Sequence, residues 1–175
     1  MTTRRQQRRK TELDGARGLA QWIVLYQAYN AIFKVAELAL LPQHLTLPQL
    51  HLLGVLKKGG GILTTGEVGQ AMVKASQTIT GLVDRLEEPG LVERVFDRKD
   101  RRKTWVRLTE KGERKFAEAS PVAARLAEEL SSVLTDEELQ DLQAKAEKLR
   151  SAAMDRLTEA LARQQAGGFA GRQGF

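Results

Sequence analysis

Hydrophobic residues recur at helical spacing along most of the chain. Between residues 14 and 41 an apolar stripe predicts one amphipathic helix. The stripe consists of Leu19, Trp22, Ile23, Tyr26, Tyr29, Ile32, Phe33, Ala36 and Leu40. Pro42 ends it, because proline cannot continue the hydrogen-bond ladder of a helix. A stripe with this many aromatic side chains needs a large surface to pack against.

Two shorter helices follow. The first begins at Thr46 or Leu47 and ends at the run Lys57-Lys58-Gly59-Gly60-Gly61. The second spans residues 65–72 and opens with a capping box, since Thr64 and Glu67 stand three residues apart and satisfy each other's backbone N–H groups. Between these helices, residues 62–63 are expected to form a short strand that pairs with a later hairpin.

A third helix is predicted to start with Ser76 at the N-cap position. Its apolar residues, Ile79, Leu82, Val83 and Leu86, fall on one face. The other face carries short or amide side chains able to bond base edges in a DNA groove: Ser76, Gln77, Thr78, Thr80, Gly81, Asp84 and Arg85. With the helix at residues 65–72, it makes a helix-turn-helix.

Gly81 is unusual because glycine inside a helix costs about 1 kcal/mol relative to alanine. It lies on the polar face, so core packing does not explain it. Two interpretations remain open: close approach of the helix backbone to DNA, or a tolerated substitution without function.

A hairpin follows the third helix. Pro89-Gly90 breaks the chain, and residues 91–96 and 104–109 alternate as strands, with Val92, Val106 and Leu108 facing inward. The loop between the strands is too charged to be buried. Its candidate nucleic-acid contacts are Arg98, Lys99, Asp100, Arg101, Arg102 and Lys103.

The C-terminal third is helical again. Pro121 is expected to kink or divide a helix that starts near Gly112, and Thr135 with Glu138 forms a second capping box. A long apolar stripe then follows, made of Leu139, Leu142, Ala146, Leu149, Ala153, Leu157 and Leu161. Together with the first helix, this stripe exceeds what a small core needs and predicts a partner surface.

Charge is unevenly distributed around a net +6 and a pI of about 9.8. Residues 1–10 carry five Lys or Arg and no acid, and residues 91–115 carry ten against five acids. Residues 128–159 carry nine acids against four bases. The concentration of cations at two places points to a polyanion. For the basic tail, residues 1–12, a solvated mobile terminus and an arm that follows DNA remain alternatives.

The absence of cysteine excludes thiolate catalysis and disulfides. With two histidines and no ordered acid–base constellation, we expect neither an enzyme nor a metal or cofactor site. We expect no window to approach the roughly 20 apolar residues of a membrane span, so a cytoplasmic protein without membrane contact is predicted.

Three motifs in sequence carry a resemblance to the MarR family of bacterial transcriptional regulators. They are Gly90-Leu91-Val92-Glu93-Arg94, Asp97-Arg98-Lys99-Asp100-Arg101-Arg102 and Leu108-Thr109-Glu110-Lys111-Gly112. The resemblance spans about residues 45–112; Gly69, where the family usually has alanine, and Pro89, where it has a polar residue, depart from the pattern.

The resemblance implies a mainly α fold with a small β-hairpin wing, a winged helix-turn-helix with terminal dimerisation helices. The helix at Ser76 would enter the major groove, and Arg102 would enter the minor groove. Asp100 would orient Arg102; the alternative is a turn residue that bonds its own backbone. The expected organisation is a basic tail (1–12), an N-terminal dimerisation helix (13–45), the DNA-binding domain (46–112), C-terminal dimerisation helices (113–166) and a flexible tail (167–175).

The resemblance further implies a homodimer that binds double-stranded DNA at a palindromic site, with repression as the expected outcome. Many relatives release DNA when a small aromatic or phenolic effector binds. Candidate effector contacts here are Trp22, Tyr26, Tyr29, His44 and His51, unless the aromatic residues are dimer core and the histidines ordinary surface or interhelical residues. The competing function is a constitutive architectural or protein-interaction module without an effector.

Overall fold

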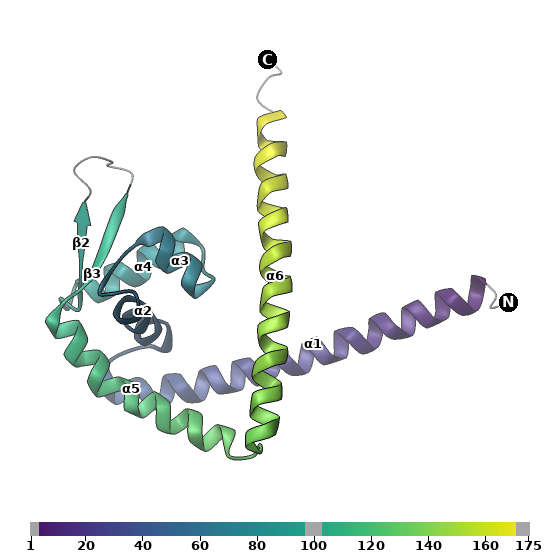
Figure 1. Ribbon diagram of the computed structural model, residues 1–175, viewed down its shortest axis with the longest axis horizontal. Helices are drawn as coiled ribbons and strands as arrows, with labels where there is room; N and C mark the ends of the chain where they lie inside the picture. Colours follow the sequence, from purple (N-terminus) through teal and green to yellow (C-terminus); the bar gives the residue numbers. More distant parts are fainter. Residues whose placement is uncertain (1–3, 97–102, 171–175) are drawn as a thin grey trace. The chain divides into compact units, whose positions relative to one another are not determined.

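The computed structural model describes residues 4–96 and 103–170, with side chains described for 18–95 and 103–163. The chain divides into two compact units, residues 1–127 and 128–175. In order, the elements are α1 (Arg4–Leu40), η1 (Leu41–Gln43), α2 (Leu47–Lys58), β1 (Ile62–Thr64), α3 (Thr65–Met72), α4 (Ser76–Glu87), β2 (Val92–Phe96), β3 (Thr104–Leu108), α5 (Glu110–Ser131) and α6 (Asp136–Ala170) (Figure 1). The predicted fold class, mainly helical with a small hairpin, is confirmed.

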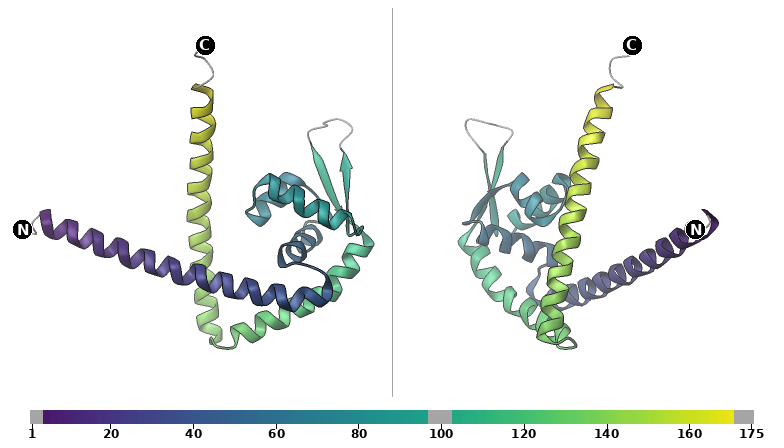
Figure 2. Two further views of the ribbon diagram at one scale, coloured as in Figure 1. Left: turned by 180° about the vertical axis from the view of Figure 1, so that it is seen from behind. Right: turned by 45° about the vertical axis from the view of Figure 1, so that its right-hand side comes forward.

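The centre of the first unit is a three-helix cluster backed by a small antiparallel sheet. The sheet has the order β1-β3-β2, with Val92 opposite Leu108 and Leu63 opposite Val106. The views from other sides show α2, α3 and α4 gathered beside the β2–β3 hairpin (Figure 2). The short strand expected at residues 62–63 therefore exists and pairs with the hairpin as predicted.

One apolar cluster holds these elements together. The side chains that are at most 1% exposed come from α1, α2, α3, α4, α5 and the sheet: Leu40, Leu52, Leu53, Leu56, Val68, Ile79, Val83, Leu86, Val92, Val106 and Ala119. The expected apolar face of α4 and the inward-facing strand residues are all among the buried residues. Each fully buried Leu, Ile or Val contributes about 1.5–3 kcal/mol relative to an exposed one.

Helix α1 joins this cluster through its C-terminal end. Ala36 and Leu40 are buried, and Glu37 accepts a hydrogen bond from the backbone N–H of Leu47 at 2.5 Å. Because Leu47 is the first residue of α2, the carboxylate lies where the helix dipole favours negative charge. A capping box of Thr46 and Gln49 completes this helix start.

Two helix starts differ from the prediction. Helix α1 begins at Arg4, ten residues before the expected Asp14, so part of the expected tail is helical backbone. Arginine, glutamine and lysine are good helix formers, which favours a helical backbone through this segment. Ser76 is the first residue of α4 rather than its N-cap. Ala75 takes the N-cap position in an extended conformation and makes no side-chain capping bond.

The C-terminal helices also refine the prediction. Pro121 does not divide α5, which continues from Glu110 to Ser131. The capping box at Thr135 and Glu138 is confirmed, with the Thr135 N–H donating to Glu138 Oε2 at 2.9 Å. Helix α6 continues to Ala170, so residues 167–170 of the expected flexible tail have helical backbone.

Large apolar side chains remain exposed on both long helices. On α6, Leu142, Leu149, Leu157 and Leu161 are exposed, and on α1 so are Trp22, Tyr26 and Tyr29. By length and composition alone, residues 18–43 also meet the criterion for a membrane-crossing helix, which contradicts the expectation that no window would approach one. The mean hydropathy of this stretch is high because it contains few charged residues, although the polar residues Gln21, Gln27 and Asn30 interrupt it.

The motif at residues 108–112 fastens the start of α5 to the chain break after α4. The Thr109 hydroxyl donates to the carbonyl of Gly90 at 2.8 Å and accepts from the Gly112 N–H at 3.0 Å. A Cβ atom on Gly112 would lie 2.0 Å from the carbonyl oxygen of Leu91. Glycine is therefore required at this position by backbone packing.

We expect Gly112→Ala to lower the free energy of unfolding by about 3 kcal/mol or more, because the new methyl group overlaps a backbone oxygen that cannot move independently. Urea unfolding monitored by circular dichroism measures this loss. Gly66→Ala is the matched control, since a Cβ atom at Gly66 meets only Thr64 Oγ1 at 3.9 Å. Equal stability of the two variants would contradict this packing argument.

Candidate DNA interface

Helix α4 is held in a single rotational orientation by its buried face. Ile79, Leu82, Val83 and Leu86 are at most 6% exposed and belong to the apolar cluster. Residues on the other face are exposed: Ser76, Gln77, Thr78, Thr80, Asp84 and Arg85, with Gly81 partly exposed between them. The structure therefore brings the predicted recognition residues together on one accessible face.

The turn between α3 and α4 is tight. Val73 has a φ of 52°, in the left-handed region that a β-branched residue seldom adopts. The Lys74 N–H donates to the carbonyl of Gly69 at 2.9 Å, which closes the turn. A Cβ atom on Gly69 would lie 3.1 Å from the Lys74 carbonyl oxygen, so glycine here lets the turn close without displacing its neighbours.

Not every polar group on α4 is free to face a ligand. The Thr80 hydroxyl donates to the carbonyl of Ser76 at 3.1 Å. Asp84 Oδ1 accepts from the Arg94 guanidinium at 2.6 Å, and Glu87 binds the same guanidinium. Burial acts to lower the pKa of Arg94, but its hydrogen bonds to Asp84 and Glu87 and their negative charges outweigh that effect, so the pKa is raised.

Sequence reasoning did not assign a role to Arg94, although the residue lies within a quoted motif. A signal was present, because two acids three residues apart on α4 precede an arginine in the next strand. Asp84 and Glu87 share a face of the helix at that spacing.

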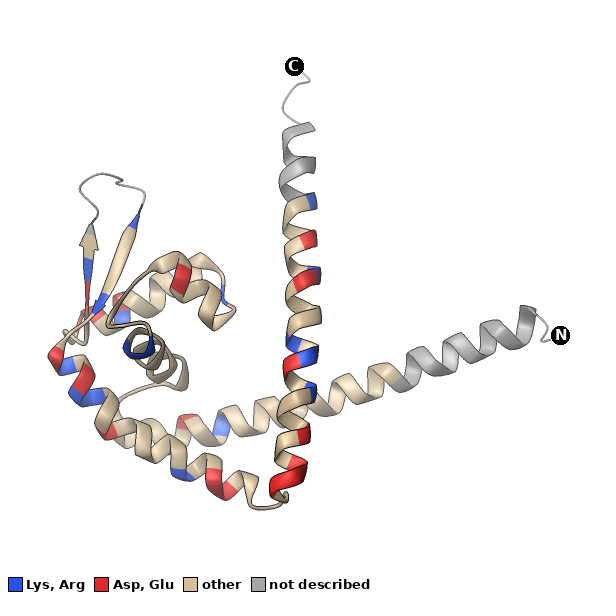
Figure 3. Cartoon of the chain, viewed as in Figure 1, with Lys and Arg blue, Asp and Glu red and all other residues tan. Residues whose placement is uncertain are grey.

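The wing is described in part. Strands β2 and β3 carry cationic residues along the hairpin (Figure 3), and Arg107 Nη1 pairs with Glu93 Oε1 at 2.9 Å across the two strands. Lys103 is exposed next to β3. The other predicted wing contacts, Arg98, Lys99, Asp100, Arg101 and Arg102, lie outside the described residues.

The five candidate effector contacts lie on α1, directly after η1 and on α2. Trp22, Tyr26 and Tyr29 lie exposed along α1, and the Tyr29 ring lies 5.8 Å from that of Phe33, centroid to centroid. His51 is exposed on α2, where partial burial of its ring and the charge of Lys74 lower its pKa. His44 alone of the five lines a described pocket.

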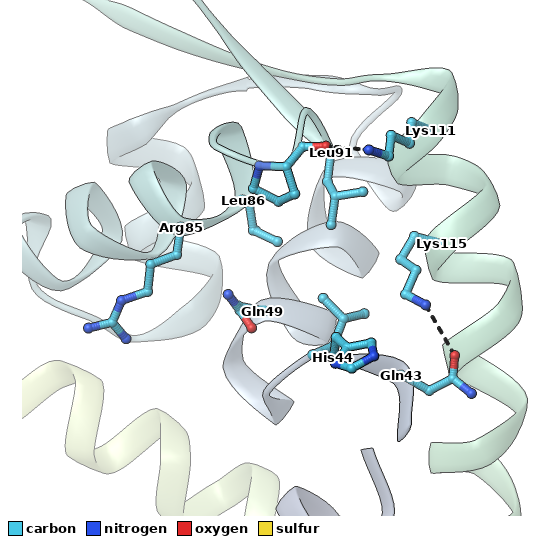
Figure 4. Close-up of a pocket in the computed structure, with 10 residues that line it drawn as sticks. Gln43, His44, Gln49, Arg85, Leu86, Leu91, Lys111 and Lys115 are labelled. Atoms are coloured by element: carbon cyan, nitrogen blue, oxygen red, sulfur yellow. Dashed lines mark hydrogen bonds between the residues drawn. The ribbon is translucent and has the colours of Figure 1, made fainter. Parts of the chain in front are cut away.

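That pocket, of about 260 Å³, lies beside the C-terminal end of α4. Its apolar wall consists of Leu45, Leu86, Pro89 and Leu91. Its polar lining consists of Gln43, His44, Gln49, Arg85, Lys111 and Lys115 (Figure 4). Sequence reasoning missed both lysines, which lie on α5 and reach the pocket only through the tertiary fold.

The pocket lysines are already hydrogen-bonded to its rim. Lys111 Nζ donates to the carbonyl of Pro89 at 2.7 Å, and Lys115 Nζ donates to Gln43 Oε1 at 3.3 Å (Figure 4). Lys115 Nζ also pairs with Glu118 Oε2 at 3.3 Å, so its charge is partly compensated at the rim of the pocket. Within the described part of the chain, no three His, Asp or Glu side chains gather as metal ligands.

Comparison with known proteins identifies the family to which this helix-and-hairpin arrangement belongs. Residues 45–103 match the model of the MarR family. Across 71% of the chain and 85% of the relative, the sequence is 32% identical to the HTH-type transcriptional regulator MhqR of Bacillus subtilis. The chain belongs to the MarR family. Its relatives are transcriptional regulators, not enzymes.

Another relative of this MarR-family chain is the HTH-type transcriptional repressor MdtR of Bacillus subtilis, 35% identical over 55% of the chain and 62% of MdtR. The chain spans between 51% and 62% of the length of MdtR and of two further relatives.

Two solved structures share the fold. A mutant MarR of E. coli complexed with operator DNA has a TM-score of 0.70 at 22% identity, covering 76% of this chain and 95% of MarR. The organohalide-sensing regulator RdhR in its 2,4-dichlorophenol-bound form has a TM-score of 0.72 at 22% identity, covering 77% and 79% of the two chains.

We expect Gly81→Ala to raise the free energy of unfolding by about 1 kcal/mol, because no atom lies within 4 Å of the added Cβ. If the backbone of α4 approaches DNA closely at this point, the same change weakens DNA binding. Gly18→Ala, another helical position with nothing within 4 Å, is the control and leaves binding unchanged. Undiminished binding by Gly81→Ala in fluorescence anisotropy would remove the close-approach role.

Proposed function

We propose that this chain is a sequence-specific DNA-binding transcriptional regulator of the cytoplasm that acts as a homodimer, most simply as a repressor. One observation carries the proposal. Four buried residues of α4 turn its polar face outward, directly beside a cationic hairpin. Amide and hydroxyl side chains on such a face read base edges in the major groove, and a basic wing suits the phosphate-lined minor groove.

The exposed apolar surface supports a dimer. Leu142, Leu149, Leu157 and Leu161 of α6 are 44–51% exposed, and monomeric proteins rarely leave so much apolar surface in water. On α1, Lys34 and the Glu37 contact with α2 make a membrane span of residues 18–43 unfavourable, because both groups carry charge. A two-fold dimer assigns the surface to a second copy of the chain.

A dimer of this kind reads two half-sites about one helical turn apart, roughly 34 Å. Selection of bound duplexes from a random DNA pool is therefore expected to recover a palindrome. Binding to it is expected to weaken steeply with salt, because phosphate contacts release counterions. A single unpaired half-site would overturn the dimeric part of the proposal, and no enrichment at all would overturn sequence-specific binding.

A small aromatic or phenolic acid is the proposed effector. The pocket at His44 is favoured because its apolar wall includes Leu86 and Pro89, at the end of α4, while Lys111 and Lys115 supply positive charge. A ligand there touches the segment that joins the recognition helix to the wing. Release of DNA requires that the ligand bind the DNA-incompetent shape more tightly, since equal affinity shifts nothing. Three alternatives remain open, effector contact, dimer core or ordinary surface, for Trp22, Tyr26, Tyr29 and His51.

We expect benzoate and 4-hydroxybenzoate to raise the melting temperature of the wild type and to weaken its binding to the selected duplex. Lys115→Met removes one ammonium group from the pocket and should abolish both effects. Lys148→Met, which removes an exposed charge on α6, should retain them. Loss of the response in both variants, or in neither, would exclude this pocket.

The competing function is a constitutive architectural or protein-interaction module without an effector. The hairpin and α4 suit that role equally well, since neither depends on a ligand. DNA binding that no phenol or benzoate alters, together with melting temperatures unchanged across such a panel, would favour it.

A further inference from the structure

Arg94 connects the wing to the recognition helix. Its guanidinium donates to Asp84 Oδ1 at 2.6 Å, to Glu87 and to the carbonyl oxygen of Thr80 at 3.2 Å. Its backbone N–H donates to Glu87 Oε1 at 2.8 Å. One residue of β2 therefore binds three positions on α4, Thr80, Asp84 and Glu87, which are spaced about one turn apart.

The environment of this contact separates it from an ordinary surface ion pair. The Arg94 side chain is 17% exposed, against 51% for Arg107, whose pair with Glu93 stays within the hairpin. Exposed pairs contribute little because water and salt screen them. A guanidinium that is largely withdrawn from water and bound by two carboxylates resists displacement, since each lost bond leaves charge uncompensated.

The covalent connection between α4 and β2 is short and bent. Gly90 has a φ of 74°, and the Leu91 N–H donates to the Leu86 carbonyl at 2.9 Å. The hairpin is also held by the pairing of β3 with β1 and by the buried side chains of Val92, Val106 and Leu108. Arg94, two residues into β2, adds a direct contact between the hairpin and the polar face of α4.

We propose that Arg94 is a positioning residue that clamps the wing to α4 through Asp84 and Glu87, so that the helix and the wing engage DNA as one unit. The proposal rests on the proposed DNA-binding function. It also gives Asp84 a role that differs from base readout: the carboxylate orients Arg94 and takes no part in choosing the base sequence. A carboxylate that faced phosphates without a cation would oppose binding by repulsion.

A double-mutant cycle on the selected duplex tests the clamp. Arg102→Ala probes the contribution of the wing and is expected to weaken wild-type binding by roughly 5- to 150-fold. In an Arg94→Met background the same Arg102→Ala change should cost less, by at least roughly twofold, because an unclamped wing no longer docks together with the helix. A role in stability alone would lower the melting temperature without changing the cost of Arg102→Ala.

The matched control is Arg107→Met, which removes the same charge from the same hairpin, while its described ion pair, with Glu93, lies within the hairpin. In that background the cost of Arg102→Ala should equal that in the wild type. An equal cost in the Arg94→Met background as well would overturn the proposal. If Arg94→Met does not fold, Arg94→Lys replaces it with the same two expected outcomes, since lysine keeps the charge but lacks the planar fork of N–H groups that binds both carboxylates.

Asp84→Asn tests whether Asp84 orients Arg94 or reads bases. The variant should reduce the loss of DNA affinity caused by Arg102→Ala, as Arg94→Met does, and should select the same base sequence as the wild type. A changed base preference with an unaltered cost would assign Asp84 to base readout and overturn its role in the clamp. Failure of the wild type to select any duplex would instead contradict the proposed function, so the two failures are distinct.

Discussion

Burial of one face of α4 is the constraint on which the rest depends. Ile79, Leu82, Val83 and Leu86 occupy the apolar cluster, and rotating the helix would bring polar side chains into it. The position of the remaining residues follows from this: the hydroxyl and amide groups face outward, and Asp84 lies beside the next strand. The core thus determines which chemistry the surface presents, at about 1.5–3 kcal/mol for each buried side chain.

Local features were predictable because their causes lie within a few residues. The capping boxes at Thr64 and Thr135, the apolar face of α4 and the strands of the hairpin all depend on spacings that the sequence displays. Ser76 shows the limit of such reasoning. Serine is favoured at an N-cap, yet the extended backbone of Ala75 takes the position, because the tight turn at Val73 decides where the helix begins.

Contacts between distant segments were not predictable. Glu37 binds the start of α2, Lys111 bonds to Pro89, and Gly112 packs against Leu91, each across 10 to 22 residues. No periodicity encodes these pairings; they appear only once the elements have packed. The pocket was missed for this reason, since its lysines come from α5 and its apolar wall combines Leu45 with residues of α4 and the chain break. The aromatic residues of α1 pose a different difficulty, because their expected neighbours belong to another molecule.

Helix α1 links its exposed aromatic surface, the proposed dimer surface, to the DNA-binding elements. Its exposed aromatic part is continuous with the end that buries Ala36 and Leu40 and carries Glu37 to α2. A helix transmits position along its length, because its hydrogen-bond ladder resists bending. If a partner covers the aromatic part, the contact between Glu37 and the start of α2, a joint between the two helices, sets the distance of each recognition helix from the dimer axis. A palindrome with fixed spacing requires such a joint, since a loosely attached domain would accept half-sites at many separations.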